Sequence, residues 1–243
     1  MSIKDTFEEV KESENSEKIN EFIIKLCENP YKEYISFIEY FLQNLSEEIF
    51  NKVKINLVYL IGKLSSTIKL DKFYLDFLKT SYFRSDRWVR NEIIKAFSEI
   101  VKHQKLKDDY IDLISISLKE DYLPIKENAL EALLNIENLK QNQLKSLFFT
   151  LDDTNSAIVV KSRKILKREI RNYNELFQLL QAQDNYKIIN KIRFRSILVG
   201  FFSSIINLEE FRKKIEDSDW QEDYKNTFLQ EIETYERIIL KNA

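Results

Sequence analysis

The side chains that most often act as nucleophiles, acids or bases are scarce in this sequence. It contains one cysteine, Cys27, and one histidine, His103, and no motif links them as a thiol nucleophile and its base. Cys27 stands in the apolar stretch FIIKLC, which predicts a small core residue. His103 follows a predicted helix, where an imidazole interacts with the carboxyl end of the helix dipole. Neither residue can build a metal cluster, so we expect no metal and no cofactor.

Motifs for acid–base chemistry and phosphate binding give no better candidates. Adjacent acids occur at residues 47–48, 108–109 and 152–153, but neighbours in a helix point in different directions and in turns they cap helices. The sequence has no glycine-rich phosphate loop, no Gly-x-Ser-x-Gly elbow and no kinase motif set. We therefore expect a protein that is not an enzyme and has no catalytic residue.

Charge is the one uneven chemical feature of the chain. Residues 157–200 hold ten basic residues against three acidic residues, a net charge of +7. Four of the basic residues have helical spacing and are predicted to share one face: Lys161, Lys164, Arg168 and Arg171. This basic strip is either a solvated helix face, a site for an acidic peptide, or a contact for a nucleic-acid backbone. The isoelectric point of the whole chain, near 5.8, argues against nucleic acid.

The overall composition is that of a globular protein with one domain or one continuous repeat array. Of 243 residues, 44% are apolar and 32% are charged, and the formal net charge is −2. Such a chain can bury a sizeable core without disulfides or metals. No stretch approaches the roughly 18–20 apolar residues of a membrane span, and the start lacks the apolar segment of a signal peptide. We expect a cytoplasmic protein that does not insert into membranes.

The elements that must position these residues are predicted to be helices. Two glycines and two prolines are too few for the turns of a sheet. Apolar residues instead recur at helical spacing, in two sets that lie 36 residues apart. The first set is Val53, Leu57, Leu60, Ile61 and Leu64, and the second is Val89, Ile93, Ala96, Phe97 and Ile100. We therefore predict an all-α protein.

The offset of 36 residues continues along the chain and indicates an internal repeat. A third set consists of Ile125, Ala129, Ala132, Leu133 and Ile136, and a shortened fourth unit contains Ile158, Ser162, Ile165 and Leu166. Arg90 falls on Lys54 one period earlier and on Lys126 one period later. Helical pairs at near-constant spacing are typical of a repeat protein.

The repeating unit resembles the HEAT repeat. The segment SDRWVRNEIIKAFSEI matches best, with an Asp in the turn between two helices, then Val-Arg and a small residue. EDYLPIKENALEALLNI is nearly as good, with Pro124 at the opening of the second helix. The resemblance covers residues 31–172 and is weaker in the first repeat, where Phe50 replaces the Asp. It implies a right-handed alpha solenoid of about four helical pairs, with the second helix of each pair on the concave side.

The resemblance also suggests how the chain is divided. Residues 1–30 are expected to form an acidic segment with a capping helix, and the repeats to span 31–66, 67–102, 103–138 and 139–172. Residues 173–243 lose the repeat and are predicted to form a helical cap that protects the last repeat. Within this cap, the apolar run from Ile197 to Ile206 predicts a helix that is buried on several sides.

Local chemistry explains most of the segment DRWVR. Asp86 is placed to cap the second helix, Val89 to enter the core, and Arg90 to reach the acidic turn of its own or a neighbouring repeat. Trp88 either packs between adjacent repeats or stands partly exposed as a binding anchor. The candidate binding surface therefore comprises Trp88, Arg90 and the basic strip.

These features favour a non-enzymatic scaffold that binds a partner protein or an acidic peptide along its concave surface. The alternative is nucleic-acid binding, including a likeness to HEAT-like DNA-repair glycosylases that rests on Asp86 near Trp88. A third possibility is an accessory to a cofactor-attaching or adaptor complex, which fold analogy alone supports.

Overall fold

The protein is built from helices. The computed structural model describes residues 2–203 and 205–242, and every regular element in these ranges is a helix, as the sequence predicted. The chain forms two compact units: unit 1, of residues 2–117 and 122–135, and unit 2, of residues 118–121 and 136 onward. None of the described helices is long and apolar enough to span a membrane.

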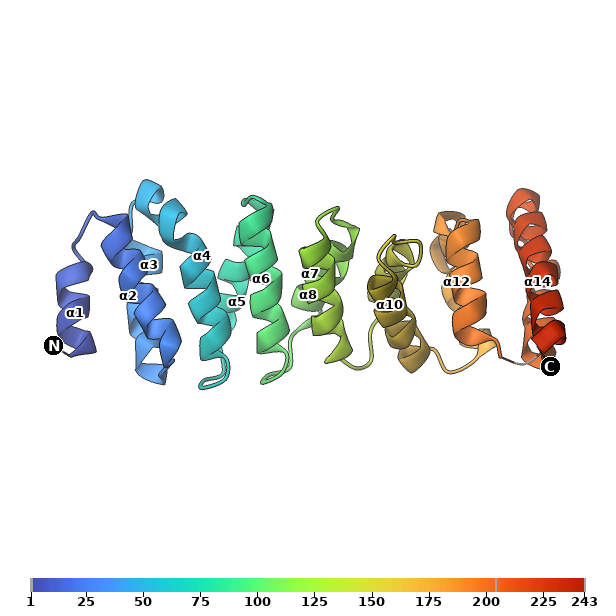
Figure 1. Cartoon of the computed structure of the whole chain (residues 1–243), viewed down its shortest axis with the longest axis horizontal. Helices are drawn as coiled ribbons and strands as arrows, with labels where there is room; N and C mark the ends of the chain where they lie inside the picture. Colours follow the sequence, from blue (N-terminus) through green and yellow to red (C-terminus); the bar gives the residue numbers. More distant parts are fainter. Residues whose placement is uncertain (1, 204, 243) are drawn as a thin grey trace. The chain divides into compact units, whose positions relative to one another are not determined.

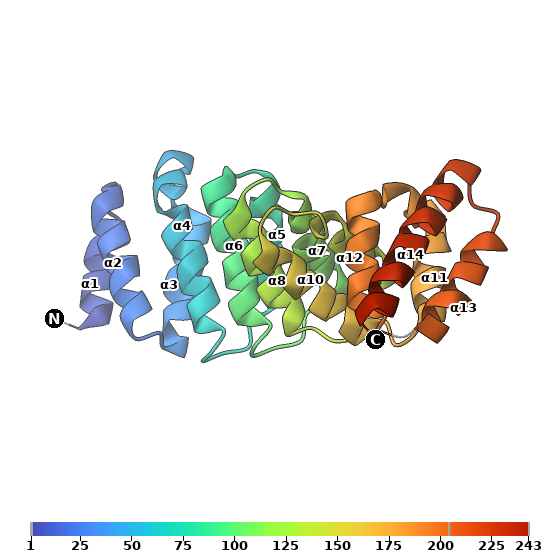
Figure 2. The same ribbon diagram turned by 45° about the vertical axis from the view of Figure 1, so that its right-hand side comes forward.

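Unit 1 is an array of helical pairs. Its helices are α1 (Ile3–Val10), α2 (Ser16–Glu28), η1 (Lys32–Tyr34), α3 (Ile35–Asn44), α4 (Glu47–Leu64), α5 (Lys72–Phe83), α6 (Arg87–Ile100), α7 (Asp108–Ile116) and α8 (Leu123–Leu134). The helices α2, α4, α6 and α8 form a row in which each packs on the next (Figure 1). The helices α3, α5 and α7 pack on α4, α6 and α8 respectively (Figure 2). We call the helices of the row the second helices of unit 1.

Capping residues define where the helices begin. Asp86 Oδ1 accepts hydrogen bonds from the backbone N–H groups of Trp88 and Val89, both at 3.0 Å, which confirms the predicted cap of α6. Asp71 caps α5 in the same way. Pro124 lies in the first turn of α8, where its missing N–H group leaves no helical hydrogen bond unmade.

The repeated apolar positions form the core of unit 1. All five members of the α4 set are buried, and so are Ile93, Ala96, Phe97 and Ile100 of the α6 set. Val89 is only half-buried, so its predicted place in the core is wrong. It lies in the first turn of α6, at the edge of the packed layer. The period found in the sequence therefore identifies the core residues of α4 and α6 except at the start of α6.

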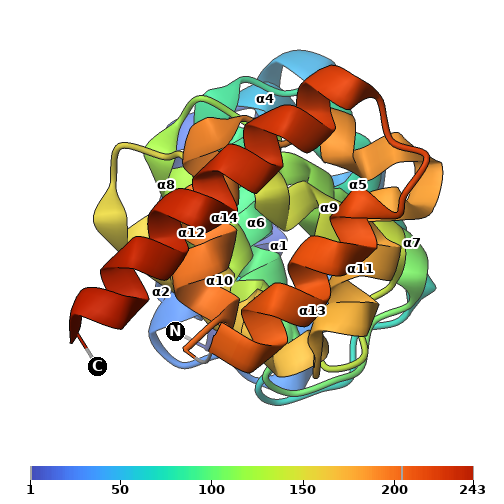
Figure 3. The ribbon, with the colours of Figure 1, turned by 90° about the vertical axis from the view of Figure 1, so that its right-hand side faces the viewer.

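Unit 2 is also arranged in helical pairs. Its helices are α9 (Gln141–Leu147), η3 (Phe148–Thr150), α10 (Ser156–Glu169), α11 (Tyr173–Gln181), η4 (Ala182–Ile188), α12 (Lys191–Phe201), α13 (Ile205–Glu216) and α14 (Glu222–Asn242); η2 (Ser117–Lys119) precedes α8 in the chain. The helix α12 packs on both α10 and α14, while α13 packs on α11 and α14 (Figure 3). Each predicted repeat range holds one helical pair, and residues 173–242 add two further pairs.

The apolar run from Ile197 to Ile206 does not form the single buried helix that was expected. The helix α12 ends at Phe201, and α13 begins at Ile205. Val199 is 56% exposed and Ile206 is 69% exposed. A helix in a packed row has neighbours on its sides and beneath it, but its outer face meets solvent. The prediction is therefore wrong for the outward-facing positions of this run.

Candidate interaction surfaces

Trp88 lies on the exposed side of α6. Its side chain is 53% exposed and meets the ring of Tyr122 nearly edge-on, with the ring centroids 5.4 Å apart. The guanidinium group of Arg87 lies 5.0 Å from the centroid of Trp88 and 5.4 Å from that of Tyr122. The two alternatives for Trp88, packing between repeats and partial exposure, thus each describe part of its environment. It contacts the next helical pair, and half of its surface stays available to a partner.

Arg90 does not join Trp88 on this exposed side. Its side chain is half-buried, and Nη1 donates a hydrogen bond to the carbonyl oxygen of Ser85 at 2.9 Å. The guanidinium group also lies 5.9 Å from the ring centroid of Tyr82. Arg90 therefore reaches the turn of its own repeat, and there it stabilises the junction of α5 and α6.

A row of asparagines crosses the second helices of unit 1. Asn56 on α4 donates from Nδ2 to Oδ1 of Asn20 on α2 at 2.8 Å, and Asn128 on α8 donates to Oδ1 of Asn91 on α6 at 3.0 Å. These bonds join residues 36 and 37 positions apart. All four side chains are half-buried. The sequence interpretation missed this asparagine row, although the near-constant spacing of the four residues could have revealed it.

Tyr59 follows Asn56 by three residues on α4 and lies near two lysines. Its ring centroid lies 5.4 Å from Nζ of Lys63 on the same helix and 5.1 Å from Nζ of Lys95 on α6. The three side chains line a shallow pocket of ≈ 70 Å³ between α4 and α6. We refer to the asparagine row, Tyr59 and Trp88 together as the second-helix face of unit 1.

The basic strip is shorter than its sequence spacing suggests. Lys161, Lys164 and Arg168 lie on α10, but the helix ends at Glu169, so Arg171 falls outside it. The prediction that Arg171 shares the helix face is therefore wrong. The guanidinium group of Arg168 pairs with Glu169 and also donates to the carbonyl oxygen of Ile136. Lys164 is exposed, whereas Lys161 is half-buried.

Ion pairs reduce the positive charge of the stretch around the basic strip. Arg195 pairs with Glu231 through two hydrogen bonds, of 2.5 and 2.9 Å. Arg193 pairs with Asp152 at 2.9 Å. Lys187 pairs with Asp184 at 2.7 Å. Because carboxylates from outside residues 157–200 supply two of these three contacts, the net charge of the sequence stretch overstates the charge that unit 2 presents.

Cys27 and His103 lie in different settings. Cys27 is half-buried on α2, and burial raises the pKa of its thiol to about 11. His103 is exposed in the turn that follows α6, where its backbone N–H donates to the carbonyl oxygen of Ile100 at 3.0 Å. Among the described residues, no group of three or more His, Cys, Asp or Glu side chains could hold a metal ion.

Comparison with known proteins supports the fold only. No family model matches the chain, and no curated protein matches it. Among solved structures, the chain is similar to an engineered protein known from its crystal structure, with a TM-score of 0.59 and 14% sequence identity. The match covers 96% of this chain and 98% of that chain. At this identity it shows the class of the fold, which is all-helical.

Replacing Trp88 with alanine is expected to lower the free energy of unfolding by only about 1 kcal/mol, because half of the side chain is already exposed and its main packing partner is a single ring. Denaturant unfolding of the wild type and of Trp88→Ala measures this difference. A loss of about 3 kcal/mol or more would instead place Trp88 among the core residues.

Proposed function

We propose that the protein is a non-enzymatic scaffold of HEAT-like helical repeats arranged as an alpha solenoid. In this proposal the second-helix face of unit 1 binds an extended segment of a partner protein. The asparagine row is the observation that carries the proposal, because it repeats one polar group across four successive second helices.

A carboxamide side chain suits the main chain of an extended peptide. It presents an oxygen acceptor and an NH₂ donor, which complement the N–H and C=O groups of a peptide bond. Packed helices lie about 8–10 Å apart, and an extended peptide advances about 3.3 Å per residue. Within each pair the two amides are hydrogen-bonded to each other, so each pair would contact one stretch of the peptide. The two pairs lie about two helix spacings apart and would contact stretches about five or six residues apart. A face of this kind recognises a chain by its backbone.

Exposed apolar groups near the row would add affinity for the partner's side chains. Trp88 stands three residues before Asn91 on α6, so the two side chains share one face of the helix. Trp88 is exposed. Tryptophan, tyrosine and arginine are enriched among binding hot spots, and Trp88 has Tyr122 and Arg87 beside it. The row would therefore set the direction of the peptide, and Trp88 would anchor one of its side chains.

The experiment that tests this function is affinity capture from native cell extract with the wild type and with an Asn56→Ala/Asn91→Ala double variant. We expect the variant to bind its partner about 30-fold more weakly, because each asparagine contributes about 1 kcal/mol through its hydrogen bonds to the peptide. The matched control is Asn207→Ala/Asn226→Ala, which removes two exposed asparagines of unit 2.

The other outcomes point elsewhere. Equal capture by the wild type and the double variant would remove the asparagine row from the binding site. Capture that disappears with nuclease would identify a nucleic-acid partner. Capture lost only when Lys161, Lys164, Arg168 and Arg171 are changed to Glu would assign an acidic partner to unit 2.

A further inference from the structure

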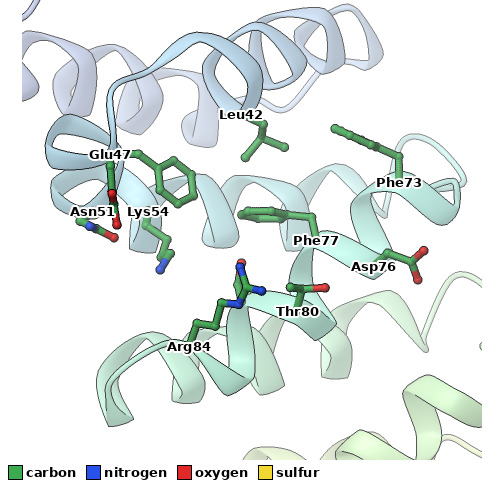
Figure 4. A pocket seen from close by; sticks show the side chains of 11 residues that line it. Leu42, Glu47, Asn51, Lys54, Phe73, Asp76, Phe77, Thr80 and Arg84 are labelled. Atoms are coloured by element: carbon green, nitrogen blue, oxygen red, sulfur yellow. The ribbon is translucent and has the colours of Figure 1, made fainter.

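A second hollow of unit 1 lies away from the asparagine row, between α3, α4 and α5. Its volume is ≈ 680 Å³, which is the size of sites that hold small organic ligands. Leu42, Phe50 and Phe77 supply apolar lining, and Lys54 and Arg84 supply two positive charges (Figure 4). We call this hollow the α3–α5 groove.

An extra turn of α4 builds one wall of the groove. The helices α4 and α6 end 36 residues apart, at Leu64 and Ile100, but α4 begins four residues earlier than that offset predicts. The extra turn is capped by Ser46, whose hydroxyl accepts from the backbone N–H of Ile49, and it places Phe50 against the groove. The centroid of Phe50 lies 6.1 Å from that of Phe77, with the rings nearly perpendicular.

Lys54 is a buried cation on the groove. The residue is only 9% exposed, and its Nζ atom lies 5.4 Å from the ring centroid of Phe50. Its hydrogen bond goes to a neutral partner, the hydroxyl of Ser85, at 3.1 Å. Burial lowers the pKa of Lys54, while the carboxylates of Asp86 and Glu47 oppose this shift. An ammonium group has three donors, so Lys54 can still donate to a ligand.

Arg84 brings a second cation to the same space. In Figure 4 its guanidinium group and the Lys54 side chain both extend into the groove near Phe77. Within residues 2–203 and 205–242, no ion pair joins Arg84 or Lys54 to a carboxylate. Two like charges that face one cavity repel each other, and an anion between them would relieve this repulsion.

Two carboxylates also line the groove and must be accounted for. Asp76 is already engaged, because Oδ1 accepts from the hydroxyl of Tyr110 at 2.7 Å and Oδ2 lies 3.8 Å from Nζ of Lys72. Glu47 lies beside Asn51 at one edge of the groove (Figure 4). Glu47 is therefore the lining carboxylate that would oppose an anion, and Asp86, which caps α6 next to Ser85, adds a second negative charge near Lys54.

We propose that the α3–α5 groove binds a small carboxylic acid with an apolar body, whose carboxylate lies between Lys54 and Arg84 and whose apolar part packs on Phe50 and Phe77. Charge-assisted hydrogen bonds from the buried Lys54 and the exposed Arg84 hold the carboxylate. The aromatic lining excludes fully polar anions as good ligands, since they would leave this apolar surface uncovered. The site is separate from the second-helix face, so it stands or fails independently of the scaffold function.

The test is calorimetric titration of the full chain with 3-phenylpropionate, with 3-phenylpropanamide as its neutral counterpart and with acetate as a charge lacking the apolar body. We expect saturable binding of 3-phenylpropionate and at least about tenfold weaker binding of the other two compounds, the effect of losing one charge-assisted contact or the apolar contact. Equal binding of the acid and its amide, or no saturable binding of the acid, would overturn the proposal.

Variants separate a role in binding from a role in folding. Lys54→Met and Arg84→Gln should each weaken binding of 3-phenylpropionate about tenfold or more, whereas Glu47→Gln should strengthen it several-fold by removing the opposing charge. The matched control is Arg171→Gln, an exposed arginine of unit 2, which should bind like the wild type. Circular dichroism checks that each variant is folded. Unchanged affinity in folded Arg84→Gln and Glu47→Gln proteins would remove the site.

A peptide ending in phenylalanine that binds more than about tenfold more tightly than the free acid would overturn the small-molecule assignment.

Discussion

Replacing Gly62 with valine is expected to lower the free energy of unfolding by about 2–3 kcal/mol, because side-chain atoms must enter a contact that is already closed. Gly62 is buried on α4, where this helix meets α6. A Cβ atom built on Gly62 would lie 3.0 Å from both Cα and Cβ of Ala96. The Cα atom of Ala96 belongs to the backbone of α6, so the clash can be relieved only by moving the two helices apart.

The matched control for Gly62 is the other glycine of the chain, Gly200. A Cβ atom on Gly200 would meet the side-chain carbons Cδ and Cγ of Arg163, at 3.2 and 3.4 Å, and a long flexible side chain can shift. Gly200→Ala is therefore expected to be neutral or to stabilise by up to about 1 kcal/mol, since alanine favours the helix. Denaturant unfolding of both variants measures the contrast. If Gly62→Val unfolds at the wild-type denaturant concentration, the close approach of α4 and α6 is wrong.

The core could be predicted from the sequence because the helical spacing of apolar residues and the 36-residue repeat both select the same positions. Leu57, Ile93 and Ala129 occupy equivalent positions in three successive second helices, and all three are buried. Helical spacing and the 36-residue offset independently select these positions. The asparagine row follows nearly the same offset, but its residues are polar and do not belong to the apolar pattern that indicates the repeat.

The α3–α5 groove could not be predicted from the repeat. Alignment on Asp86 places Phe50 in the turn before the second helix, but Ser46 caps α4 four residues earlier. Local capping chemistry therefore overrides the offset, and Phe50 becomes a helical residue that lines the groove.

The predicted charge around the basic strip was too high for a different reason, because ion pairs with residues distant in sequence cannot be seen in the sequence. Counting charges along residues 157–200 cannot reveal partners that lie elsewhere in the chain. Glu231 is only 6% exposed and contacts Arg195 from α14, 36 positions later. Such pairs are formed by the packing of neighbouring helices. A local excess of charge is therefore weaker evidence for a binding site than a charge that the fold leaves facing a cavity.

The thiol of Cys27 is expected to react with iodoacetamide about 100-fold more slowly in the native protein than in the unfolded chain at pH 8. Burial raises the pKa of this thiol to about 11, with Lys63 acting in the opposite direction and Glu92 in the same direction. Only the thiolate is nucleophilic, and about one thiol in a thousand is ionised at three pH units below its pKa. Because Cys27 is the only cysteine, mass spectrometry of the intact chain measures its alkylation directly.

The pH dependence of this reaction distinguishes a raised pKa from simple steric protection. With the raised pKa, the native alkylation rate should rise about tenfold per pH unit from pH 7 to 10 without levelling off. A thiol that is merely shielded would level off near pH 9, where an ordinary cysteine is half ionised. Lys63→Gln is the matched variant, and it should slow the reaction further because it removes the one cation that favours the thiolate. Fast alkylation at pH 8 would contradict the burial of this thiol, and slow alkylation with a plateau near pH 9 would contradict its raised pKa. Slow alkylation without a plateau would show that the single cysteine is a poor nucleophile at neutral pH, because burial disfavours its thiolate.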